Sequence, residues 1–165
     1  SRSSTINFPG NFAAAPATIP SPIGPAPARK ISPELLLNTD WLITNETEFL
    51  IIHPENKYPD ESEIKFLANH LNLNLVVTLG ENGIKICLKD GSFHEIKANK
   101  IKVVDTTAAG DVFVGSFSAL LTQKYSPFIA AELASKIATQ SVGRQGAQSS
   151  IPTKEEIITL ISTGI

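Results

Sequence analysis

Residues 105–115 have the residue types and the spacing that phosphoryl transfer requires. Small residues from Ala108 onward precede Asp111, and an apolar stripe that starts at Phe113 has the period of an α-helix. Small residues at a helix start leave backbone N–H groups open to an anion, and the helix dipole adds positive potential. An acid at the same point can accept a proton from a nucleophile attacking that anion. The simpler alternative is that Asp111 only stabilises the helix start.

Asn45 and Glu48 form a second candidate element directly after the apolar run 41–44. An amide and a carboxylate one helical turn apart face the same way and can order a hydrated magnesium ion. The alternative is an acidic helix start that the dipole favours.

Two glycine-containing segments could approach a ligand through their backbones. Gly80 and Gly83 follow the apolar run 74–79 and allow close approach to a nucleotide, although Asn82-Gly83 is also an ordinary turn pair. The segment 143–152 could hold a cation with backbone oxygens, or it could be a plain glycine-rich loop.

Predicted strands and helices alternate along most of the chain. Strands are expected at 41–44, 74–79, 83–89, 92–96 and 101–104, the third and fourth forming a hairpin around Asp90-Gly91. Helices are expected at 34–38, from 45, from Asp60 with a capping box to Glu63, from 110, at 127–140 and at 153–161. The pattern predicts an α/β fold with a largely parallel sheet, whose ligands bind beyond the carboxyl ends of the strands.

Composition narrows the function classes. The chain has 165 residues, 42% hydrophobic and 18% charged, with a net charge of −2, so neither nucleic acid nor an anionic membrane is an expected partner. Cys87 is expected in the core. His53, His70 and His94 lack metal-ligand spacing and are expected on the surface or in loops. A cytoplasmic location is the expectation.

The four candidate segments, in this order, resemble the ribokinase family of carbohydrate kinases. The resemblance rests on the segments 45–48, 78–84, 105–115 and 143–152, and it departs from the family at Ala108, where Gly is usual, and at Ile51–Pro54, where Leu-Thr-Gly is usual. It implies a ribokinase-like three-layer αβα fold with Asp111 as catalytic base and substrate contact. The implied anion hole consists of Ala108, Ala109 and Gly110.

The resemblance also implies ligand sets for ATP, Mg²⁺ and K⁺. The implied ATP contacts are Asn45, Leu79, Gly80, Glu81, Asn82, Gly83, Ile84, Gly110, Asp111 and Ser135. Magnesium would be held by Asn45 and Glu48, partly through water. Potassium would be held by the side chains of Asp105 and Ser150 and the carbonyls of Thr107, Ser141, Arg144 and Gly146.

The resemblance covers only the C-terminal part of the family pattern. Residues 1–24 are expected to be an irregular Pro/Ala-rich segment, and 25–165 the nucleotide, metal and base side of a kinase domain. The sugar-binding motif and β lid of the family have no counterpart. We therefore expect an ATP-dependent sugar kinase, with ribose converted to ribose 5-phosphate, that is inactive alone. The expected partners are ATP, the sugar and either a second copy in a homodimer or a complementing N-terminal chain. The alternatives are a fructokinase-like sugar kinase and a non-catalytic nucleotide-binding remnant.

Overall fold

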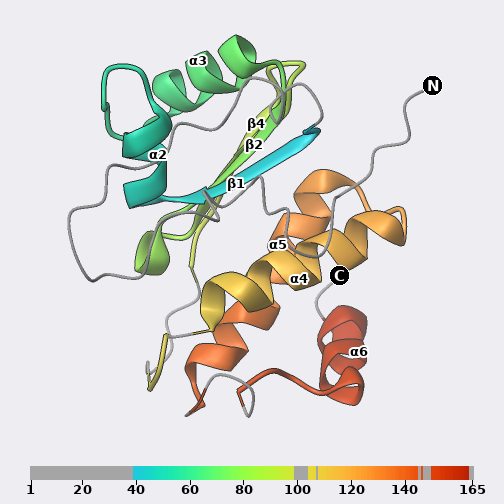
Figure 1. Cartoon of the computed structure of the whole chain (residues 1–165). Coiled ribbons are helices and arrows are strands. Elements are labelled where there is room, and N and C mark those ends of the chain that lie inside the picture. Colours follow the sequence, from blue (N-terminus) through green and yellow to red (C-terminus); the bar gives the residue numbers. More distant parts are fainter. Residues whose placement is uncertain (1–38, 99–103, 107, 145, 147–149, 164–165) are drawn as a thin grey trace. The chain divides into compact units, whose positions relative to one another are not determined.

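The computed structural model describes residues 39–98, 104–106, 108–144, 146 and 150–163 (Figure 1). The irregular segment predicted at 1–24 and the helix predicted at 34–38 lie outside these residues. The chain divides into two compact units. Of the described residues, the first unit comprises 39–79 together with Lys85–Glu95, and the second comprises Gly80–Ile84 and the described residues from Ile96 onward.

A four-stranded sheet has the order β1-β2-β3-β4. Its strands are β1 (Trp41–Asn45), β2 (Asn74–Thr78), β3 (Ile84–Cys87) and β4 (Phe93–Ile96). The strands β1 and β2 are parallel, with Asn45 opposite Thr78, and their apolar middles are buried. This arrangement confirms the α/β pattern and brings the end of β1 level with the end of β2.

The hairpin predicted around Asp90-Gly91 is present. The Leu88 N–H donates to the Ser92 carbonyl at 2.8 Å, and Asp90 Oδ1 accepts the Ser92 N–H at 2.8 Å. Cys87, at the end of β3, is 1% exposed, which confirms its expected place in the core.

The helices α2 (Glu46–Ile52) and α3 (Glu61–Leu71) follow β1 and precede β2, against which both pack. Asp60 caps α3 by accepting the Glu63 N–H at 2.9 Å. The predicted capping box is only half formed, because the Asp60 N–H donates to the Tyr58 carbonyl and the Glu63 carboxylate contacts His53 and Lys57 instead.

His53, expected on the surface or in a loop, lies outside the helix at the C-cap of α2, but it is not on the surface, because it is only 2% exposed. It ends α2, and its ring contacts the rings of Phe49 and Phe66. The other two histidines, His70 and His94, are exposed as predicted.

The second unit is built on three helices, α4 (Ala109–Thr122), α5 (Pro127–Val142) and α6 (Lys154–Thr163). The predicted stripe of α4 is buried at Phe113, Phe117 and Leu120, and α4 packs along α5. The buried face of α5 is rich in small residues, which lets the two helices approach closely. Its buried residues are Ala130, Ala131, Leu133, Ala134, Ser135, Ile137 and Ser141.

Candidate active site

The first turn of α4 has no side-chain cap. Ala108 is the N-cap residue, and no side-chain hydrogen bond satisfies the turn. The Ala109 N–H donates to the Thr106 carbonyl and the Val112 N–H donates to the Ala108 carbonyl. Among the described residues, the N–H groups of Gly110 and Asp111 have no acceptor. Two backbone donors at the positive end of a helix dipole are therefore available to an anion.

Asp111 lies in this same turn and is exposed. A carboxylate at a helix start can accept a proton from a hydroxyl group that approaches the same turn. The acid and the two donors belong to one turn of one helix. Of the anion hole predicted at Ala108, Ala109 and Gly110, only Gly110 is one of these two donors, because the Ala109 N–H is already bonded to Thr106.

Asn45 and Glu48 are brought together at the start of α2. Asn45 Oδ1 accepts the Glu48 N–H at 2.8 Å, and Glu48 Oε2 accepts the Asn45 N–H at 2.9 Å, which is a reciprocal capping box. Partial burial raises the pKa of Glu48, while its hydrogen bond to Asn45 lowers it by less. The pair therefore has a structural role as well as oxygens suited to a hard cation.

The segment predicted to contact the nucleotide forms the 3₁₀ turn η1 (Gly80–Asn82), and the Gly83 N–H donates to the Gly80 carbonyl at 3.1 Å. Gly80 has φ +55° and Gly83 has φ +93°. A Cβ on Gly83 would lie 2.0 Å from the Ile96 carbonyl oxygen, so this position requires glycine.

The remaining predicted nucleotide contacts differ in exposure. Glu81 and Asn82 are exposed. The side chains of Leu79 and Ile84 are buried, so their nucleotide contacts would come from backbone atoms. Ser135 lies on the buried face of α5 at 9% exposure.

The predicted cation ligands converge around the end of α5. Asp105 Oδ2 accepts the Gly146 N–H at 3.1 Å, and the Ser150 N–H donates to the Gly146 carbonyl at 3.2 Å. The Ser141 carbonyl accepts the Arg144 N–H at 3.1 Å. Thr107 lies outside the described residues. Val104, the last residue of the strand predicted at 101–104, is exposed outside any strand, and 101–103 are not described.

The guanidinium of Arg144 fixes the loop after α5 to α6. It forms two bonds to the Glu156 carboxylate, at 3.0 and 2.6 Å. Glu156 also accepts the Thr153 N–H at 2.8 Å, and Arg144 is the main cause that lowers the pKa of Glu156 to about 2. A bidentate arginine pair of this kind fixes direction as well as distance.

Sequence reasoning missed one feature beside the metal pair. Thr44 precedes Asn45, is 2% exposed, and its hydroxyl has no partner within the described part of the chain. A threonine in an apolar run gives no signal that its hydroxyl is buried without a partner, so pattern alone could not have found it.

Among the described residues, no group of three or more His, Cys, Asp or Glu side chains is placed to hold a metal ion. The magnesium site predicted at Asn45 and Glu48 has one carboxylate and does not require such a group. None of the described helices has the length and apolar character needed to span a membrane.

The fold and these elements define a class of protein. Residues 12–154 match the model of the pfkB family of carbohydrate kinases. The chain is 36% identical over 140 residues to a ribokinase of Staphylococcus aureus, which covers 82% of this chain and 45% of that protein.

Two solved structures extend the comparison. A ribokinase of Thermotoga maritima has a TM-score of 0.71 at 36% identity, covering 84% of this chain and 47% of the other. An Arabidopsis thaliana ribokinase complexed with ribose and ATP has a TM-score of 0.72 at 26% identity, covering 81% and 44%. This chain belongs to the pfkB family of carbohydrate kinases, and it spans less than half the length of these relatives.

Proposed function

We propose that this chain carries the nucleotide, metal and catalytic-base side of an ATP-dependent kinase that phosphorylates ribose. The observation that carries the proposal is Asp111, an exposed acid in the same helical turn as two backbone N–H groups that have no acceptor in the described part of the chain. Similarity to ribokinases, one of them complexed with ribose and ATP, supports the choice of substrate and phosphoryl donor.

In the proposed reaction, the Asp111 carboxylate takes the proton of the primary hydroxyl of ribose. The hydroxyl oxygen forms a bond to the γ-phosphorus of ATP while the bond from that phosphorus to the β–γ bridging oxygen breaks, giving ribose 5-phosphate and ADP. The N–H groups of Gly110 and Asp111 donate to the oxygens on which negative charge develops, together with that of Ala109 once its bond to Thr106 opens.

Asn45 and Glu48 would hold Mg²⁺, partly through water. Their oxygens suit this ion, and only Oε2 of the Glu48 carboxylate is used in the capping box. When bound, the ion would neutralise phosphate charge. The capping box fixes both side chains at the start of α2 and would thereby fix the position of the ion.

Asp105, Ser141, Arg144, Gly146 and Ser150, with Thr107, would hold K⁺. The donors are all oxygens, and the carbonyls of Ser141 and Gly146 each keep a second lone pair beyond the bonds they already accept. When bound, the ion would add positive charge near the anion hole. Asp105 itself links the segment that precedes α4 to the loop that follows α5.

We further propose that these residues alone do not turn over sugar. The family resemblance assigns most sugar contacts to a part that precedes the matched segments, and positioning supplies much of the acceleration in such reactions. Activity then requires a complementing N-terminal part.

The test measures ribose-dependent ADP formation by this chain, alone and fused to the preceding part of the Staphylococcus aureus ribokinase. We expect turnover only in the fusion, and a loss of at least about 100-fold in Asp111→Asn. Asp90→Asn, an exposed acid in the hairpin turn, is the matched control and keeps full activity.

The same assay separates the alternatives. Faster turnover of fructose than of ribose would favour a fructokinase-like enzyme. Nucleotide binding without turnover of any sugar, in the chain and in the fusion alike, would favour a non-catalytic nucleotide-binding module and contradict the kinase proposal.

A further inference from the structure

His53 closes the C-terminal end of α2, the helix whose other end carries Asn45 and Glu48. Its backbone N–H donates to the Phe49 carbonyl at 2.9 Å, and its side chain is 1% exposed. The imidazole lies between the ring of Phe49, at 5.5 Å, and the ring of Phe66 on α3, at 5.6 Å. A histidine buried this completely needs polar partners.

The loop after α2 supplies those partners at Nδ1. This nitrogen accepts the N–H of Glu55 at 3.2 Å and that of Lys57 at 3.4 Å. An atom that accepts cannot carry the proton, so this geometry assigns the ring proton to Nε2. The imidazole thereby holds the loop that leads from α2 toward α3.

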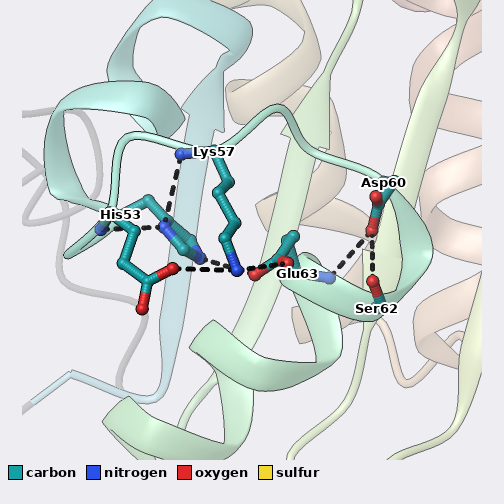
Figure 2. Close-up of polar contacts among 6 residues, drawn as sticks. His53, Lys57, Asp60, Ser62 and Glu63 are labelled. Carbon is teal, nitrogen blue, oxygen red and sulfur yellow. Dashed lines mark hydrogen bonds and ion pairs between the residues drawn. The ribbon is translucent and has the colours of Figure 1, made fainter.

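Nε2 faces α3. Glu63 Oε2 lies 3.0 Å from it, but the ring N–H is not aligned with that oxygen, so the contact is a charge–dipole interaction and not a full hydrogen bond. Lys57 Nζ joins Glu63 Oε1 at 3.0 Å and Glu55 Oε2 at 2.9 Å, as Figure 2 shows. One ring therefore contacts the end of α2, the following loop and α3.

We propose that His53 is a positioning residue for the Asn45–Glu48 pair. A helix of seven residues has little stability of its own, so holding one end affects the hydrogen bonds at the other. Phe49 is fully buried between the two ends and transmits the fixed position of the ring. The metal role of the pair rests on the proposed function, whereas its geometry does not.

Amide hydrogen exchange tests this coupling in the unliganded chain. The readouts are the Asn45 and Glu48 N–H groups, both donors in the capping box. Asn at position 53 keeps an acceptor near the place of Nδ1, and Gln keeps a donor near the place of Nε2. Both lose the ring, so His53→Asn and His53→Gln differ mainly in the acceptor.

We expect these two amides to exchange about tenfold faster in His53→Gln than in His53→Asn, the effect of losing one hydrogen bond. His70→Gln is the matched control. The ring of His70 also stacks on Phe66, but His70 is exposed, so this substitution should leave both exchange rates unchanged. The Val76 N–H in β2 is the reference for global opening.

Equal rates in His53→Asn and His53→Gln would overturn the proposal, as would acceleration of Val76 by the same factor, since that is a loss of overall stability. Titration of the wild-type chain and of His53→Gln with ATP and MgCl₂ distinguishes failure of the positioning role from failure of the proposed function. Wild-type chain that shows no Mg²⁺-dependent binding contradicts the proposed function and leaves the exchange result standing. Equal Mg²⁺ affinity in wild type and His53→Gln, despite altered exchange, overturns the positioning role.

Discussion

Asp105 and Gly146 are 41 positions apart in the chain, yet Asp105 Oδ2 accepts the Gly146 N–H at 3.1 Å. The Asp105 N–H also donates to the Val142 carbonyl at 3.2 Å, at the end of α5. The approach to α4 and the loop after α5 are therefore joined at two points. The proposed anion hole and the proposed cation site share this connection.

Asp105→Asn should weaken that connection. The amide oxygen of Asn can still accept the Gly146 N–H, but a charged acceptor is replaced by a neutral one, which should cost about 1 kcal/mol of unfolding free energy. Urea unfolding checks the value, with Glu95→Gln, an exposed acid in β4, as control. The variant should also lose any stabilisation that KCl gives over choline chloride; a KCl effect that survives in the variant would remove Asp105 from the cation site.

Glu48→Gln should separate stability from metal binding. The amide oxygen can still accept the Asn45 N–H. The substitution also removes the carboxylate charge, whose partial burial raises the Glu48 pKa. The free energy of unfolding at pH 7 should therefore be equal to or higher than that of the wild type. Mg²⁺-dependent ATP binding should fall by at least about tenfold. Glu46→Gln, in the same first turn but outside the capping box, serves as the control.

The raised pKa of Glu48 also predicts the direction in which stability changes with pH. The folded state binds the proton more tightly than the unfolded chain, so stability falls as pH rises above the usual value of 4.5 through the raised pKa. Glu48→Gln should lack this fall. An identical pH profile for both proteins would contradict the assignment.

Glu156 should act in the opposite direction. Its pKa is lowered from 4.5 to about 2, chiefly by the Arg144 guanidinium, so its contribution is present above pH 4.5 and is lost as pH falls toward 2. Acid unfolding of Glu156→Gln, followed by circular dichroism, should show less loss of stability in this window. Arg144→Lys, which cannot form the two-bond fork, should shift the Glu156 contribution toward its usual pH range.

Gly83→Ala should be far more damaging than Gly80→Ala. Both positions have positive φ, which costs alanine about 1–2 kcal/mol. At Gly83 the added Cβ would also lie 2.0 Å from the Ile96 carbonyl oxygen, whereas nothing lies within 4 Å at Gly80. We expect a loss of about 3 kcal/mol or more at Gly83, measured by urea unfolding. Similar losses at both positions would contradict the close approach to Ile96.

Thr44→Val should raise stability. The Thr44 hydroxyl is buried with no partner in the described ranges, and replacing it with a methyl group of similar shape should add about 1 kcal/mol. Thr78→Val is the opposite-sign control, because the Thr78 hydroxyl donates to the Thr44 carbonyl at 3.3 Å. A loss of stability in Thr44→Val would show that its hydroxyl is hydrogen-bonded in solution.

The elements with strong local signals were predictable from sequence. Continuous apolar runs located β1 and β2, apolar patterns with the helical period located α3 and α4, and Asp90-Gly91 located the hairpin. The placement of Asp111 in the first turn of α4 followed from the small residues before it.

What could not be predicted depends on contacts distant in sequence. The burial of His53 requires Phe66 and Glu63 on the next helix, although its spacing of four from Phe49 places both on one helix face. The half-formed capping box at Asp60 has the same cause, since Glu63 contacts charged and buried groups that no local pattern specifies. The bond from Asp105 to Gly146 likewise has no local signature.

The uncapped start of α4 has a consequence for engineering. Ala108 occupies the N-cap position, where serine, threonine, asparagine or aspartate would add about 1 kcal/mol. Any of these side chains would accept one of the N–H groups that the proposed site offers to phosphate. A stabilisation strategy based on N-cap preferences would therefore choose position 108. It would raise thermal stability but block the proposed anion hole, so activity would be exchanged for stability at a single residue.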